Sequence, residues 1–345
     1  MNRIIANITL FLSLINLSAG AVSIGKMGRV SIDYRSKSAA SIIMSISLEN
    51  IDLKSIEYNG EIYTDIRVGG TANYHLIGQP QLPVIRKMIR LPLNGKIDCE
   101  LTVHSEEYLD LSKNGFHRPL LPAQPYRRKT DGGFRPIRID RQIYDKDSYY
   151  SPGPVKVNQE FSIGGIRGIM LDYFPISYNP VQNTLKIITK ATIVISIAEE
   201  QNLQKRTADV FPINPAFEQM ADRLFINNDM SAFSVKSETA ETFLVISGDK
   251  FADDDVLRSY LNWKRQCGFR IIQKSLSDAG GSASAIKEYI VNRYHSENPP
   301  AYVLLIGDVA DVPAWHGSAS DSESDAPYSR MDDDFFPDVM VGGFR

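Results

Sequence analysis

The stretch from 301 to 308, Ala-Tyr-Val-Leu-Leu-Ile-Gly-Asp, leaves little choice of fold for its part of the chain. The five consecutive apolar residues 302–306 predict a strand that is buried on both faces. Gly307 and Asp308 then lead into a loop that begins with a carboxylate. In open α/β sheets, binding and catalytic sites are built at this carboxyl end of the strands. We therefore expect Asp308 to lie at a functional edge.

The residues before this strand repeat a strand–helix pattern. Apolar runs at 243–246 and 269–276 predict two further strands. Two helices are predicted by apolar residues at helical spacing: Val256, Tyr260, Leu261 and Trp263 in the first, and Ile286, Tyr289, Ile290 and Tyr294 in the second. Gly268 caps the first helix, and Pro299-Pro300 stops the second. This order predicts a parallel sheet with right-handed crossovers.

Residues 1–21 have the pattern of a signal peptide. Arg3 supplies the positive charge, residues 4–17 are mostly apolar, and Ala19-Gly20-Ala21 offers small residues to a signal peptidase. A buried N-terminal helix is the alternative, but the segment is terminal, uncapped and ends in small residues. No later run approaches the roughly 20 apolar residues of a membrane span. We expect an exported protein without a membrane span, secreted or held at the cell surface.

Residues 22–200 carry the signals of strands rather than helices. Alternating or β-branched runs occupy five segments, 41–48, 62–68, 85–91, 101–104 and 184–197. Short strands of this kind predict an antiparallel β-sandwich. Six prolines between 118 and 160 indicate long loops that cross the sandwich. Residues 201–240 are polar, contain an exposed basic pair and predict an interdomain linker that is open to proteolytic processing.

Composition and charge restrict the partners and the chemistry. The formal net charge of −3 supplies no basic face for phosphates, which excludes nucleic acid as a partner. Two cysteines, Cys99 and Cys267, do not make a disulfide framework, although a single bridge stays open. Cys267 ends a predicted helix, where the helix dipole raises a thiol pKa, so it is a poor candidate for a nucleophile.

Several motifs together, in order and spacing, resemble the gingipain-type cysteine peptidases, family C25. Those of the C-terminal part are Phe243–Ile246, Tyr260–Arg270, Tyr302–Asp308, Asp311-Val312-Pro313, Ser320-Asp321, Tyr328 and Asp338–Gly342. They resemble the start of the catalytic domain, which has a caspase-like α/β fold. Upstream, Gly78-Gln79-Pro80 and Leu82-Pro83-Val84 are similar to the propeptide of the same family. The two resemblances cover nearly everything after the signal segment.

The resemblance implies a division of the chain. Residues 22–200 correspond to a propeptide, and residues 241–345 to the N-terminal part of the peptidase domain, which is truncated. The family's catalytic His and Cys are then expected downstream of Arg345, and neither a nucleophile nor its base is assigned here. His316 falls in the loop after the third strand, away from the family's His position, so we expect it to be a surface or structural residue.

An acidic segment near the end of the chain suggests a metal site. Asp332, Asp334, Phe336 and Asp338 are spaced two apart, which in an extended segment places their side chains on one side. A hard cation takes carboxylates and backbone carbonyls as ligands. Related peptidases hold calcium with a comparable set, which implies calcium bound by Asp308, these three aspartates and the Phe336 carbonyl. A solvated acidic turn is the alternative.

We therefore expect a secreted precursor of a gingipain-like cysteine endopeptidase. Its partners would be a protein or peptide substrate and, within the chain, the propeptide on the peptidase domain. The competing interpretation is a non-catalytic secreted calcium-binding or adhesion module built on the same folds. A nucleotide-binding domain is disfavoured, since the turn at 247–250, Ser-Gly-Asp-Lys, is neither a phosphate loop nor a dinucleotide fingerprint.

Overall fold

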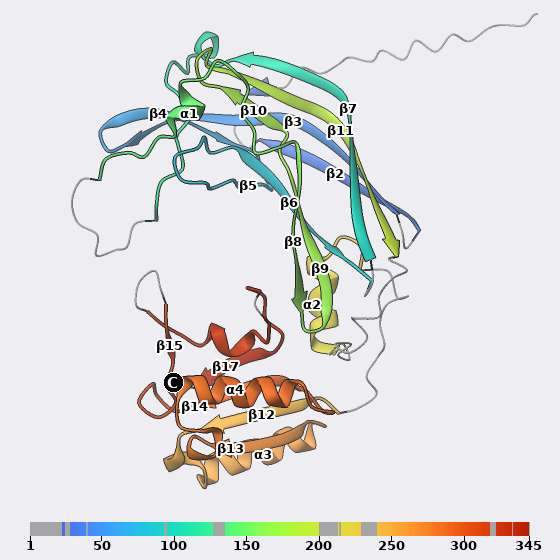
Figure 1. Cartoon of the computed structure of the whole chain (residues 1–345), viewed down its shortest axis with the longest axis vertical. Coiled ribbons are helices and arrows are strands. Elements are labelled where there is room, and N and C mark those ends of the chain that lie inside the picture. Colours follow the sequence, from blue (N-terminus) through green and yellow to red (C-terminus); the bar gives the residue numbers. More distant parts are fainter. Residues whose placement is uncertain are drawn as a thin grey trace, which may run out of the picture.

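The computed structural model comprises a β-sandwich domain followed by an α/β domain (Figure 1). It describes residues 23–24, 28–38, 41–92, 95–126, 135–199, 213, 215–228, 240–317, 322–332 and 334–344. The predicted signal peptide, 1–21, lies outside the described residues. Within them, no helix is both long and apolar enough to cross a membrane.

Within the described ranges, the larger sheet of the sandwich has seven strands. They are β1 (Ser23–Ile24), β2 (Arg29–Ser38), β3 (Ser41–Tyr58), β4 (Glu61–Arg67), β7 (Gly95–Asp110), β10 (Ile176–Asn179) and β11 (Thr184–Glu199). The long β3 pairs antiparallel with β2, β4 and β11, and β11 pairs with β7 and β10. Ile42, Met44 and Ile46 are buried at every second position of β3, which is the alternation that predicted this strand.

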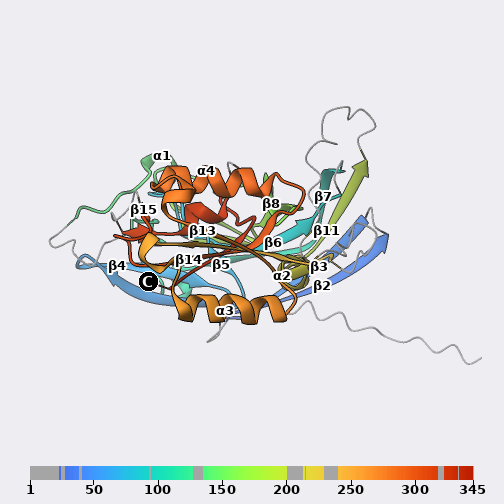
Figure 2. The same ribbon diagram turned by 90° about the horizontal axis from the view of Figure 1, so that it is seen from below.

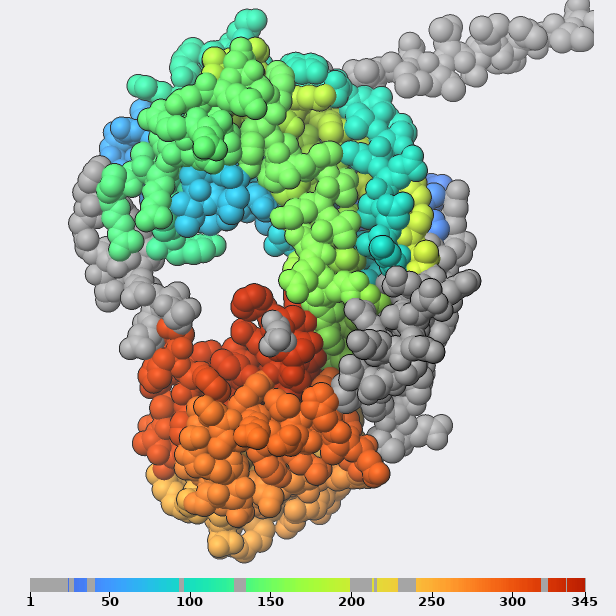
Figure 3. Space-filling view, in the orientation of Figure 1, coloured from blue at the N-terminus to red at the C-terminus, as the bar shows by residue number. Residues whose placement is uncertain are grey.

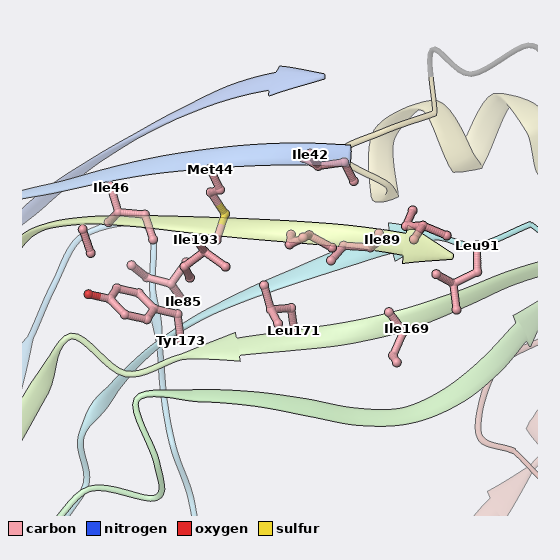
Figure 4. Packing of buried hydrophobic residues seen from close by; sticks show 13 residues of the cluster. Ile42, Met44, Ile46, Ile85, Ile89, Leu91, Ile169, Leu171, Tyr173 and Ile193 are labelled. Carbon is pink, nitrogen blue, oxygen red and sulfur yellow. The ribbon is translucent and has the colours of Figure 1, made fainter. Parts of the chain in front are cut away.

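The smaller sheet lies face to face with the larger one. Among the described residues its order is β5 (Ala72–Asn73), β6 (Pro83–Arg90), β9 (Ile166–Tyr173), β8 (Val155–Ile163). Figure 4 shows the shared core, to which the larger sheet contributes Ile42, Met44, Ile46 and Ile193, and the smaller sheet Ile85, Ile89, Ile169 and Leu171. The sandwich prediction is confirmed. The expected loop up to residue 160 is wrong for β8, whose polar, largely exposed first half marks an edge strand.

The α/β domain has a parallel sheet in the order β13-β12-β14-β17. Its elements are β12 (Thr242–Ser247), α3 (Asp255–Gln266), β13 (Arg270–Ser275), α4 (Ala283–Tyr294), β14 (Pro300–Ile306) and β17 (Met340–Phe344). Successive residues of β12 face opposite layers, because Leu244 and Ile246 pack toward α4, whereas Phe243 and Val245 pack toward α3. Figure 2 shows the two helices on opposite faces of the sheet. The predicted strand–helix order is confirmed.

The apolar face predicted for α3 is only partly correct. Leu261 is buried as expected, but Val256 is 77% and Trp263 is 53% exposed. The buried partner of Leu261 is Leu257, one turn away, so the helix covers the sheet with a narrower stripe than the composition suggested. On α4 the prediction is confirmed for Ile286, Ile290 and Tyr294, which are buried.

Helix α2 (Pro215–Leu224) lies inside the segment expected to be a linker, 201–240. Phe217, Ala221 and Phe225 recur at helical spacing, are buried and pack against the β8–β9 hairpin. The described part of the expected linker, 215–228, therefore belongs structurally to the sandwich. Residues 201–212, 214 and 229–239 lie outside the described residues.

Candidate functional site

The loops after β12 and β14 meet at one edge of the parallel sheet. The Gly248 N–H donates to the Ile306 carbonyl at 2.8 Å, which ties the two loops together. Gly307 has φ +125°, and a Cβ there would collide with the Cβ of Asp311, so this turn requires glycine. Asp311 pairs with the Lys250 ammonium at 2.8 Å. The sheet edge is thus built from close backbone contacts and one ion pair.

Asp308 lies at this edge, as predicted, and is exposed. Its Oδ1 accepts the N–H of Val309 at 2.7 Å. Together with Glu323 and Asp325 it lines a pocket of about 240 Å³. The three other aspartates of the predicted calcium site do not line this pocket. The structure therefore gives Asp308 acidic neighbours other than those expected.

Two aspartates of the 332–338 segment act electrostatically on a third, Asp338. Asp338 is 3% exposed and its Oδ2 accepts the N–H of Met331 at 2.8 Å. Burial raises the pKa of Asp338 to about 7, and the charges of Asp332 and Asp334 act in the same direction. The charges of Asp332 and Asp334 therefore reach Asp338, whereas the placement of all three side chains on one side of the segment stays a prediction.

The acidic segment is not a preformed cradle for a cation. No three His, Cys, Asp or Glu side chains in the described part of the chain converge as metal ligands. Asp332 Oδ1 already accepts the N–H of Asp334 at 3.0 Å. The buried Lys287 ammonium, which interacts electrostatically with Asp338, places a positive charge beside the segment. Calcium at these positions stays a prediction.

The same segment makes an aromatic contact with the sandwich domain. Phe336 stacks on Phe161 of β8, with ring centroids 4.1 Å apart and planes inclined by 26°. Phe336 and Met340 also pack against a cluster that includes Ile163 and Ile166 of the β8–β9 hairpin. Figure 3 shows the hairpin touching the α/β domain, with open space beside the contact.

Two hydrogen bonds fix the register of this contact. The N–H of Ser162 donates to Asp334 Oδ2 at 2.7 Å, and the N–H of Gly164 donates to the Pro337 carbonyl at 3.2 Å. Both donors are backbone groups of the hairpin, and both acceptors belong to the 334–337 segment. We call this set of contacts, between residues 161–166 and 334–340, the domain seam.

The β8–β9 hairpin that forms the seam is not among the elements predicted from the sequence. Gly164 and Gly165 have φ +52° and +80°, the left-handed values that a two-residue hairpin turn of type I′ requires. The Gly-Gly pair between the runs 161–163 and 166–171 was the available signal. It was overlooked because the proline-rich stretch before it suggested a loop.

Comparison with known proteins assigns the family. The family model of the C25 propeptide matches residues 20–227, and that of peptidase family C25 matches residues 236–344. The chain belongs to peptidase family C25. Its sandwich domain, helix α2 included, is a C25 propeptide, and its α/β domain is part of a C25 peptidase domain. The predicted resemblance is confirmed.

Curated relatives of this C25 chain come from Porphyromonas gingivalis. Lys-gingipain HG66 is 24% identical over 304 residues, which is 86% of the chain and 18% of that protein, and gingipain R1 is 25% identical over 272 residues, 77% of the chain and 26% of that protein. A solved structure on the zymogenic latency of gingipain K, 21% identical, covers 52% of this chain and 98% of that one, with a TM-score of 0.47. A complex of the RgpB pro- and mature domains, 16% identical, covers 57% and 97%, also with a TM-score of 0.47. The chain thus spans 18% of the length of Lys-gingipain HG66.

The C25 chain offers no thiol poised for catalysis within its described residues. Cys99 and Cys267 are both free, which settles the open question of a bridge between them. Burial raises the pKa of Cys99 to about 11, and the charge of Asp98 adds to this effect. His316 is exposed on β15 (Trp315–His316), which pairs with β16 (Glu323–Ser324). The catalytic His and Cys expected downstream of Arg345 stay a prediction.

Proposed function

We propose that this C25 chain is the N-terminal part of a secreted precursor of a gingipain-like cysteine endopeptidase. In this proposal, residues 1–21 direct export, and the propeptide binds its own peptidase domain and keeps it latent. The complete enzyme then cleaves peptide bonds in proteins or peptides. The family assignment of both domains supports the reaction class.

The domain seam is the observation that carries the proposed contact between the propeptide and its peptidase domain. An aromatic stack and two hydrogen bonds donated by backbone N–H groups, one to the Asp334 carboxylate and one to the Pro337 carbonyl, join the propeptide to the segment that leads into β17, the last described strand of the sheet. This segment enters β17 at the strand's amino end, whereas sites of open α/β sheets are built at the carboxyl ends, where Asp308 lies. The seam therefore supports a propeptide that docks on its own peptidase domain, and the latency is proposed from the order and the family of the two domains.

Catalysis belongs to residues downstream of Arg345 in this proposal. A Cys thiolate attacks the peptide carbonyl carbon, a C–S bond forms, and the amine leaves with a proton delivered by a His. Water then hydrolyses the acyl-thioester and regenerates the thiol. The contribution of the described residues is the parallel sheet that carries the catalytic loops and the seam that holds the propeptide on it.

Expression of the complete precursor tests the reaction class and the latency. We expect no hydrolysis of a peptide substrate by the intact precursor, hydrolysis after the propeptide is removed, and loss of that activity on alkylation with iodoacetamide. A complete gene product that stays inactive after removal of residues 22–228 would favour the non-catalytic module. Hydrolysis that iodoacetamide leaves unchanged would contradict a cysteine peptidase.

We propose separately that a calcium ion is bound by Asp308, Asp332, Asp334, Asp338 and the Phe336 carbonyl. The latency proposal does not depend on this calcium site. The electrostatic effect of Asp332 and Asp334 on Asp338 supports the proposal. Calcium should raise the melting temperature of the full chain relative to EDTA, and Asp338→Asn should abolish the difference. Equal melting temperatures in calcium and EDTA would leave the solvated acidic turn as the correct interpretation.

A further inference from the structure

Helix α2 and the residues after it are fixed to the sandwich by a buried polar cluster. The Arg90 side chain, 4% exposed, donates two hydrogen bonds of 3.0 Å to the Glu218 carboxylate and one of 2.6 Å to Asn228 Oδ1. Asn227 brackets the Arg90 backbone, because its Oδ1 accepts the Arg90 N–H at 2.7 Å and its Nδ2 donates to the Arg90 carbonyl at 3.0 Å. This cluster holds residues 218–228 on β6.

The aromatic residues of the same segment support the β8–β9 hairpin. Phe217 is fully buried and lies so close to Gly164 that a Cβ on that glycine would collide with its ring. Phe225 stacks on Phe161 with ring centroids 6.0 Å apart and planes inclined by 20°. Gly168 leaves room for this stack, since a Cβ there would collide with both rings. The hairpin thus rests on residues 217–225 at its turn and along its strands.

Phe161 is the common partner of two rings from different parts of the molecule. Phe225 stacks on it from the segment after α2, and Phe336 stacks on it from the α/β domain. Phe161 and Phe225 are each 5% exposed, so neither ring has room to turn aside without opening the cluster. The position that Phe161 offers to the peptidase domain therefore depends on Phe225.

We propose that residues 215–228 position the surface by which the propeptide binds its peptidase domain, because they hold Phe161 and the β8–β9 hairpin where the 334–340 segment meets them. This inference rests on the proposed function, since the partner is the chain's own peptidase domain. A propeptide that ends before α2 binds that domain more weakly than one that extends to Asn228. Phe217 and Phe225 are positioning residues that act through the hairpin.

Hydrogen exchange in the full chain tests this proposal. The amides of Ser162 and Gly164 donate across the seam, so their exchange rates report directly on the contact. Phe225→Ala and Phe217→Ala should raise both rates about tenfold, because loss of their support opens the seam locally. Phe225→Leu, which keeps most of the volume, should restore most of the protection. Leu224→Ala, at an exposed position of the same helix, is the control and should change neither rate.

Two further measurements make each outcome decisive. Unchanged hydrogen exchange in β3 and β11 shows that the sandwich of a variant is folded. Glu218→Gln loosens α2 without altering an aromatic ring, so it replaces an alanine variant that does not fold. Phe336→Ala is the reference for direct loss of the seam. If Phe336→Ala raises the two rates and the α2 variants do not, the proposal is wrong while the domain contact stands. If Phe336→Ala also leaves them unchanged, the seam itself is absent, and the proposed contact between the propeptide and its peptidase domain fails with it.

Discussion

The ring of Phe336 stacks on the ring of Phe161 across the boundary between the two domains, 4.1 Å from centroid to centroid. Its neighbour Phe335 is 83% exposed, and the Arg330 guanidinium lies over the Phe335 ring, 5.3 Å from the centroid. The pair joins the propeptide to the peptidase segment through a hydrophobic contact, which removes the facing surfaces of both rings from water. The seam therefore has an aromatic pair at its centre and, beside it, two hydrogen bonds donated by backbone N–H groups of the hairpin.

Phe336→Ala should expose the peptidase side of the seam to proteolysis. An aromatic pair contributes about 0.5–1.5 kcal/mol beyond its buried area, so we expect tryptic cleavage after Arg330 to become roughly five- to tenfold faster. Mass spectrometry of the fragments measures the rate, and Val256→Ala, at a 77% exposed position of the same domain, is the control that should leave it unchanged. Equal rates for both variants and the wild type would contradict the stack as a stabilising contact.

Glu218→Gln should destabilise the propeptide domain. Removing one partner of a buried ion pair costs about 3–5 kcal/mol, and because the Glu218 side chain is 27% exposed we expect about 2 kcal/mol here. Urea unfolding measures the loss. Asp145→Asn breaks an exposed pair with Arg141 and should cost no more than about 1 kcal/mol. A loss no greater than that of Asp145→Asn would show that Arg90 keeps adequate partners without Glu218.

Lys287→Met should stabilise the α/β domain. The Lys287 ammonium is buried without a hydrogen-bond partner among the described residues. Leaving a buried polar group unpaired lowers the free energy of unfolding by about 1–3 kcal/mol, and we expect Lys287→Met to recover about 1 kcal/mol of this loss. Thermal unfolding measures the gain, and Lys146→Met at an exposed position is the control. A lower melting temperature for Lys287→Met would indicate a required charge.

The same lysine predicts a pH dependence. Burial lowers the pKa of Lys287 below its ordinary value of 10.5, so the folded state loses this proton first and the unfolded state binds more protons. The destabilisation is full at neutral pH and fades as the pH rises through the lowered pKa toward 10.5. The advantage of Lys287→Met over the wild type should shrink accordingly in melting curves. A stability advantage of Lys287→Met that grows with pH would contradict a lowered pKa of Lys287 in the folded state.

Thiol labelling should separate the two cysteines. The pKa of Cys99 is raised to about 11, so only about one in a thousand of its thiols is ionised at pH 8. Cys267 is exposed and therefore open to the reagent. Maleimide should therefore label one site quickly, and Cys267→Ser should remove the fast phase. Fast labelling that survives this substitution would mean that Cys99 is more open than the structure shows.

The elements that local pattern predicted are those whose environment is set by burial alone. β12 and β14 are covered by helices on both faces, so their residues form uninterrupted apolar runs. β3 faces one core, so it alternates. In α3 the same reasoning was only partly correct, because Leu257 and Leu261 are buried on the sheet and Tyr260 is half-buried against the same cluster, whereas Trp263 is exposed and packs against Tyr260.

The seam could not be predicted from local pattern. Phe161, Phe225 and Phe336 come from three segments far apart in the sequence, and each looks like an ordinary core residue in its own segment. The docking of α2 depends on Arg90, a buried arginine on β6 whose partner lies in a supposed linker. Asp338 was found by its spacing, but its burial, and hence its raised pKa, follows from the tertiary fold.

Inhibition of the mature peptidase domain by separately produced residues 22–228 is the most direct measurement. The propeptide has its own sandwich core, so it can be produced alone. We predict binding that stops hydrolysis of a peptide substrate, with affinity at least about tenfold weaker for Phe161→Ala, a loss of about 1.4 kcal/mol. Hydrolysis that continues at the same rate with saturating propeptide would contradict the central claim that the seam joins the two domains into a latent precursor.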